Sequence, residues 1–190
     1  MNKPAAPPSK VQQQGGFLNL SPLIAKLNHS RLAFLRAAES VPCHQWTAKP
    51  SAEEWSAAEL VVHLVLVEQG IVGTARRIIE KTPKHFALWK RFHFPMWLVE
   101  ARVVRRKSPI PLDPSLISAK ENMLRQMGQT RQATLQFLEE TSGRKLSVYR
   151  WKHPFLGILN LYEWFEMIAA HQVRHTKQLK EIESRLRKVV

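Results

Sequence analysis

The sequence has a single cysteine, Cys43, among its 190 residues, and it has no long apolar run. One cysteine excludes an internal disulfide and is typical of a protein in the reducing cytoplasm, where we expect this chain. No stretch approaches the ~18 uninterrupted apolar residues of a membrane-spanning helix, so we expect no membrane partner. Residues 1–16 are rich in Pro, Gln and Gly and lack the apolar core of a signal peptide. We predict a disordered leader there, followed by one domain over residues 17–190.

Acidic residues are also scarce: 15 Asp and Glu stand against 29 Lys and Arg, which gives a formal net charge of +14. Such an excess can attract nucleic acid or an anionic membrane. Here the basic residues are scattered, and no aromatic residues alternate with them in a recognised nucleic-acid motif. A solvated basic surface is therefore the favoured interpretation, and nucleic acid stays open as the less favoured partner. The positive electrostatic field of such a surface would also suit an anionic small-molecule substrate.

Strand signals are missing as well, because the sequence contains no period-two alternation. It also contains neither of two nucleotide-binding motifs, GxGxxG and the P-loop. Four capped segments with helical periodicity are present instead. They begin at Ser21-Pro22, Ser56, Asp113-Pro114 and Asn160 and run to about Ser40, Lys81, Ser142-Gly143 and Leu186. The sequence predicts an all-α fold, a four-helix bundle without a sheet.

Residues 83–112 form a long connection between the second and third predicted helices. A short helix from Pro95 to about Arg105 is compatible with this stretch. A connection of this length allows the second and third helices to lie parallel, as in bundles with a crossover.

Three histidines carry the strongest chemical signal. His171 and His175 are four residues apart, so on a helix both imidazoles lie on one face. His63 lies in another amphipathic segment and can supply a third imidazole from a facing helix. Three protein ligands that leave other positions open are typical of a catalytic metal, whereas structural zinc is usually closed by four. The alternative is a vestigial site in which one of the three positions no longer binds.

Other polar residues near these histidines are open to two interpretations. Glu59 and Gln178 could accept a hydrogen bond from the second nitrogen of a ligand ring, although a helix cap is the favoured role for Glu59. Glu68 could face the metal or be solvated. His153 could line the pocket, although a role in stabilising the turn before the last helix is favoured.

Two runs resemble the DinB-like proteins. KPSAEEWSAAELVVHLVLVE, residues 49–68, resembles the entry to their second helix. HPFLGILNLYEWFEMIAAHQVRHTKQLKEI, residues 153–182, resembles their last loop and helix, in which a His-Pro-x-x-Gly turn precedes His-x-x-x-His and then Gln. The resemblance covers most of residues 20–186. It implies an up-up-down-down bundle with a long crossover and a homodimer. It also implies a divalent metal (zinc, nickel, iron or manganese) held by His63, His171 and His175.

The resemblance also suggests a reaction class. Characterised relatives include S-transferases and isomerases that use bacillithiol, mycothiol or glutathione, and many members have no assigned activity. We therefore expect a metal-dependent enzyme acting on a small molecule with a low-molecular-weight thiol as co-substrate, and hydrolysis is a close variant. No catalytic residue besides the metal ligands is predicted. The alternative is a non-enzymatic, stress-related protein that binds nucleic acid or an acidic partner. The basic insertion at residues 84–107 has no counterpart in the family pattern.

Overall fold

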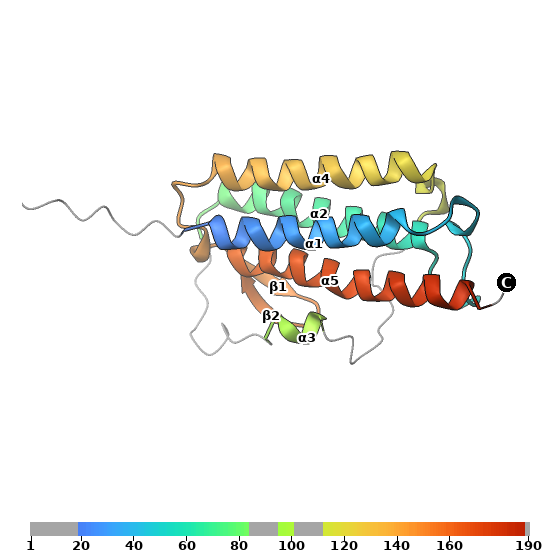
Figure 1. Ribbon diagram of the computed structural model, residues 1–190. Helices are drawn as coiled ribbons and strands as arrows, with labels where there is room; N and C mark the ends of the chain where they lie inside the picture. The colour runs from blue at the N-terminus through green and yellow to red at the C-terminus, as the bar shows by residue number, and fades with distance from the viewer. Residues whose placement is uncertain (1–18, 84–94, 101–111, 189–190) are drawn as a thin grey trace, which may run out of the picture.

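The computed structural model describes residues 19–83, 95–100 and 112–188. Within these ranges four long helices form a bundle (Figure 1). They are α1 (Ser21–Glu39), α2 (Ala57–Ile79), α4 (Lys120–Glu140) and α5 (Leu161–Leu186). The short helix α3 (Trp97–Glu100) lies against α5, and two strands, β1 (Arg150–His153) and β2 (Gly157–Asn160), precede α5. The all-α bundle is therefore confirmed. The predicted leader and most of the basic insertion lie outside the described residues.

The starts of α2 and α5 follow the predicted caps. Ser56 and Asn160 each form a capping box, in which the cap side chain accepts from the third backbone N–H of the helix and a glutamate reaches back. The predicted start of the third helix at Asp113-Pro114 is wrong. Asp113 caps only one 3-10 turn, Pro114–Leu116, after which Ile117 is extended and α4 begins at Lys120. The cap signal was real, but it belonged to a separate turn.

Side-chain contacts fix the helix directions. Residues pair in increasing order along α1 and α5, and likewise along α2 and α4, so each of these pairs is parallel. The pairs are Lys26 with Glu166, Ser40 with Glu183, Gln69 with Thr130, and Arg76 with Glu140. Lys120, at the start of α4, donates to the carbonyl oxygen of Glu39 at the end of α1, so those two helices are antiparallel.

The order of directions is thus up-down-down-up, and the expected up-up-down-down order is wrong. The reason lies in where the helices begin: residues 40–56 reverse the chain between α1 and α2, and α4 begins at the same end of the bundle as α2 (Figure 1). The predicted crossover and the parallel arrangement of the second and third long helices are confirmed.

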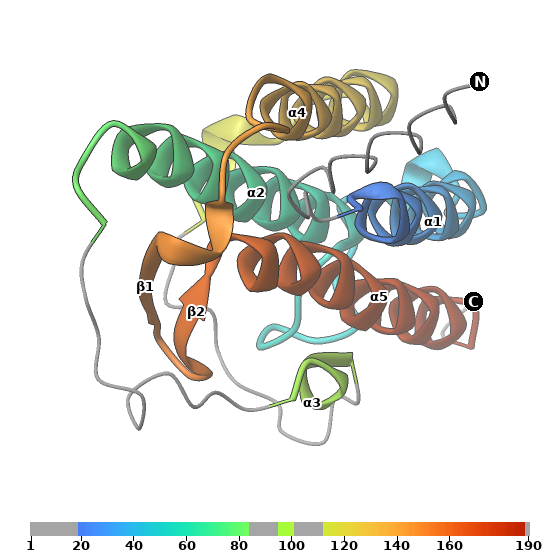
Figure 2. The same cartoon turned by 90° about the vertical axis from the view of Figure 1, so that its left-hand side faces the viewer.

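The β1–β2 hairpin corrects the expectation that no sheet forms. The strands pair antiparallel from Arg150 with Asn160 to His153 with Gly157, and Gly157 has a φ of 96°. A positive φ of this size favours glycine. Each strand has only four residues, which is too short for alternation to stand out in the sequence. The hairpin lies at the N-terminal end of α5 (Figure 2).

The apolar core has two halves along the bundle axis. One contains Phe34, Leu60 and Leu179, and the other contains Leu27 and Phe137 among its fully buried residues. Among the described helices, α2 is long and apolar enough to cross a membrane by length and composition alone. Most of that stretch is buried in the bundle, as expected of a core helix. The predicted compartment stays a prediction.

Candidate metal centre

The three predicted histidines converge between α2 and α5. His63 lies on α2, and His171 and His175 lie one turn apart on α5. The Nε2 atom of His171 lies 3.2 Å from Nε2 of His63 and 3.0 Å from Nε2 of His175. One nitrogen from each ring lies within 4.8 Å of the others. The structure therefore brings together side chains that are more than a hundred residues apart in the sequence.

This arrangement has the dimensions of a metal site. Two nitrogens that are each about 2.0–2.1 Å from one ion lie about 2.8–3.4 Å apart when the angle at the metal is near 90–110°. The two separations around His171 fall close to that range. An imidazole nitrogen that binds a metal presents a lone pair, and three lone pairs facing one another repel unless a cation or protons lie between them. The donor set thus fits a divalent ion.

The protein environment favours neutral rings. Burial lowers the pKa of His63 from its usual 6.5 to about 4. Burial also holds the pKa of His171 well below its usual value, with a further lowering from the charges that His175, His63, Arg174 and His153 place nearby. Desolvation disfavours the protonated form of histidine. Since only neutral imidazole binds a metal, these shifts keep His63 and His171 in their ligating form at neutral pH.

Neighbouring side chains orient the rings. Gln178 accepts a hydrogen bond from Nδ1 of His175 at 2.9 Å, which places a proton on Nδ1 and directs Nε2, the nitrogen that would be the ligand, toward His171. Trp55 packs against two members of the cluster, with ring centroids 4.9 Å from His63 and 6.2 Å from His175. The role considered for Gln178 is thus present, and Trp55 forms one wall of the cluster.

Other polar residues take the roles that the sequence left open. Glu59 caps α2, and the Lys49 ammonium lies 2.7 Å from its carboxylate. His153 stabilises its turn, because its Nδ1 accepts from the backbone N–H groups of Phe155 and Leu156 at 3.1 Å. Glu68 neither joins the three-histidine cluster nor is solvated. Its residue exposure is only 5%, and its carboxylate binds Arg131.

The short helix α3 is held beside the cluster by two cationic side chains of α5. Arg174 donates to the carbonyl oxygen of Val99 at 3.3 Å, and Lys177 donates to that of Glu100 at 2.9 Å. Both donors lie within three residues of His171 or His175 on the same helix. The short helix α3 therefore lies against the stretch of α5 that carries His171 and His175 (Figure 2).

The bundle and the histidine cluster together define a class: four-helix-bundle proteins with a candidate metal site between two core helices. The sequence profile of the DinB superfamily matches residues 26–179, so the chain belongs to that superfamily. It is similar to the uncharacterized protein YuaE of Bacillus subtilis (strain 168), with 28% identity over 165 residues. The matched region covers 84% of this chain and 96% of that relative.

Proposed function

We propose that this protein is a metal-dependent enzyme in which His63, His171 and His175 hold one divalent ion: zinc, nickel, iron or manganese. Its substrate would be a small molecule, with a low-molecular-weight thiol as co-substrate in a transferase or isomerase reaction. Hydrolysis is the close variant. The observation that carries the proposal is the convergence of three imidazole nitrogens, two of whose separations are 3.0 and 3.2 Å.

The number of protein ligands supports a catalytic site over a structural one. The cluster of possible ligands within the described ranges consists of three histidines, without a nearby cysteine, aspartate or glutamate. Structural zinc is usually closed by four protein ligands, whereas three leave room for a substrate atom or water. A bound divalent ion would supply a lowered pKa to a coordinated thiol or water, which makes it a nucleophile at neutral pH.

The chain's own residues would prepare this chemistry. Burial keeps the rings of His63 and His171 neutral, and Gln178 fixes the orientation of His175. Trp55 shields one side of the cluster from water. In the transferase reaction a thiol would lose its proton, its sulfur would form a bond to an electrophilic carbon, and a leaving group would depart from that carbon.

The test begins with elemental analysis of the purified protein, then zinc titration of the metal-free form. We expect one divalent ion per chain, and we expect His171→Ala to remove it. The matched control is His29→Ala, because His29 is an exposed histidine of α1 outside the cluster. Zinc binding that is equal in both variants would overturn the proposal and favour the non-enzymatic alternative.

A second experiment tests the reaction class. Metal-loaded protein is incubated with an electrophile and with bacillithiol, mycothiol or glutathione, and loss of free thiol is followed. We expect metal-dependent transfer with at least one of these thiols. If metal binds but no thiol reacts, hydrolysis by coordinated water becomes the leading reaction. Homodimer formation remains an expectation, and a light-scattering mass of 22.0 kDa, that of one chain, would contradict it.

A further inference from the structure

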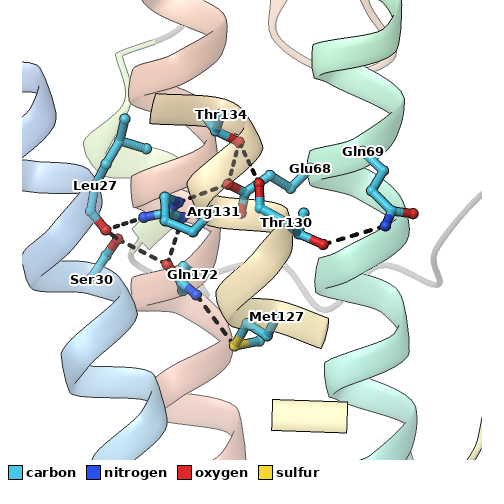
Figure 3. Close-up of polar contacts among 9 residues, drawn as sticks. All are labelled: Leu27, Ser30, Glu68, Gln69, Met127, Thr130, Arg131, Thr134 and Gln172. Carbon is cyan, nitrogen blue, oxygen red and sulfur yellow. Dashed lines mark hydrogen bonds and ion pairs between the residues drawn. The ribbon is translucent and has the colours of Figure 1, made fainter. Parts of the chain in front are cut away.

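A network of buried polar side chains crosses the bundle between the two halves of the apolar core (Figure 3). We call it the polar layer, and it consists of Ser30, Glu68, Arg131, Thr134 and Gln172. Each of the four long helices contributes at least one member. Every one of these residues is buried, and Arg131 has an exposure of only 1%. A guanidinium at such depth needs partners for all of its donors.

Each of the three side-chain nitrogens of Arg131 has a partner, and these partners lie on three helices. Its Nε donates to Glu68 Oε1 at 2.7 Å and its Nη2 to Glu68 Oε2 at 3.0 Å, a bidentate pair with α2. Nη2 also donates to Oε1 of Gln172 on α5 at 3.0 Å, and Nη1 donates to the carbonyl oxygen of Leu27 on α1. Thr134 and Ser30 complete the network by donating to Glu68 and Gln172, at 2.6 and 3.0 Å.

Stability alone does not account for such a pair. Taking two charges out of water costs about as much as their attraction returns, and well-packed apolar side chains of similar size are often as stable or more so. Hydrogen bonds differ from apolar contacts in being directional. A bidentate guanidinium–carboxylate pair is satisfied in one geometry only, whereas apolar helix faces tolerate small shifts along their axes.

The polar layer lies next to the histidine cluster along both helices that carry it. Glu68 follows His63 on α2 by five residues, a rise of about 7.5 Å at 1.5 Å per residue. Gln172 directly follows His171 on α5 and precedes His175 by three residues. Because Arg131 binds both Glu68 and Gln172, it fixes the axial position of α2 relative to α5 close to the three imidazoles.

We infer that Glu68, Arg131 and Gln172 are positioning residues for the histidine cluster. They hold α2 and α5 in the one register that places His63 opposite His171 and His175. This inference rests on the proposed function insofar as metal affinity is its readout. An axial shift of even a fraction of an ångström would change the nitrogen separations on which a shared ion depends.

The experiment replaces the pair by apolar side chains, Glu68→Met with Arg131→Met, so that no buried charge is left unpaired. The matched control is Arg76→Met with Glu140→Met. It removes another ion pair between the same two helices, one that is largely exposed and distant from the cluster in sequence. Thermal unfolding and circular dichroism report on the fold, and competition with a zinc-binding dye reports on affinity.

We expect the Glu68/Arg131 variant to keep its helicity and to bind zinc about 10-fold or more weakly, the usual scale for losing a group that orients metal ligands. The control should bind zinc within about twofold of the wild type, since an exposed pair contributes little. Wild-type zinc affinity in a folded Glu68/Arg131 variant would overturn the inference.

Two additions keep the test decisive. If the double variant does not fold, Gln172→Met cuts the link to α5 while the Glu68–Arg131 pair stays intact, and a weaker zinc affinity is again expected.

Nuclear Overhauser effects between the ring protons of His63 and His171 report on the distance between the two rings, and they can be measured in the metal-free protein. We expect them in the wild type and the control and expect them weakened in the positioning variants. If they are unchanged, the inference fails, whereas a wild type that shows them but binds no zinc defeats only the proposed function.

Discussion

The histidine cluster and the polar layer are two buried polar regions in the middle of the same bundle, and they are built in opposite ways. In the cluster, three imidazole rings direct the same kind of nitrogen at one another, and burial lowers the pKa of His63 and His171. In the polar layer, full charges meet, and Arg131 finds acceptors on three helices. The polar layer satisfies its charges within the protein, whereas the histidine cluster has the donor set of a site for an external cation.

This difference separates a scaffold from a site. A buried charge network that satisfies itself resists change, because removing one partner strands the other. Uncharged imidazole rings cost less free energy to bury than charged groups do, and a cluster of them is stabilised most when it binds a metal ion. We therefore expect substitutions in the cluster to affect metal binding without much effect on the fold. Single substitutions in the polar layer should affect the fold first.

The largest effect on binding is expected from His175→Ala. Losing a group that only orients a ligand costs about 10–100-fold in affinity, so losing a ligand should exceed about 100-fold. The fold should persist, because the apolar core of the bundle is extensive without a metal. Circular dichroism and metal content are measured side by side. If helicity and metal disappear together, the metal is structural and the contrast between scaffold and site breaks down.

The largest effect on stability is expected from Arg131→Met alone. This change leaves the Glu68 carboxylate buried with only the Thr134 hydroxyl as a partner among its present contacts, and it should destabilise the fold by about 3–5 kcal/mol. Urea unfolding measures the loss. Adding Glu68→Met should restore most of the stability. A single variant as stable as the wild type would show that the polar layer is not a self-satisfying charge network.

Acid should weaken the metal-free protein through the histidine cluster. In the unfolded chain His63 takes up a proton near pH 6.5, but in the folded chain only near pH 4, because burial lowers its pKa. Its contribution to stability is therefore complete above pH 6.5 and lost as the pH falls toward 4, by up to about 3 kcal/mol. Urea midpoints measured across this range should fall less in His63→Gln. Parallel pH profiles for both proteins would contradict the buried, neutral ring.

A smaller effect is expected from Gln178→Ala, which removes the acceptor for Nδ1 of His175. Zinc affinity should fall about 10-fold, because the ring loses its fixed orientation. Gln132→Ala is the control, since Gln132 is an exposed glutamine of α4. Equal losses in the two variants would mean that the hydrogen bond to His175 does not support the cluster.

The sequence revealed the cluster more readily than the layer, for a physical reason. The four-residue spacing of His171 and His175 indicates that they share one face of a helix. The capping boxes at Ser56 and Asn160 mark the helix starts, and each is complete within four residues of sequence. The partner of Glu68 lies 63 residues away, and no local pattern indicates it. A buried arginine in a helix with many polar residues looks like a solvated one until the fold is known.

Other misses have the same origin. The direction of each helix depends on how its connections cross the bundle, which local periodicity does not encode. The hairpin was missed because its strands are only four residues long, and the third helix was placed too early because Asp113 caps a single turn. The wall that Trp55 forms beside His63 arises from a contact between a loop and two helices.

X-ray absorption spectroscopy of the protein loaded with one zinc per chain tests the central claim most directly. We expect three imidazole nitrogens at about 2.0–2.1 Å from the zinc, with the remaining positions filled by solvent oxygen atoms. We also expect His63→Ala to lower the number of imidazole ligands to two for any zinc that is still bound. A spectrum with fewer than three imidazoles in the wild type, or one unchanged by His63→Ala, would contradict the account.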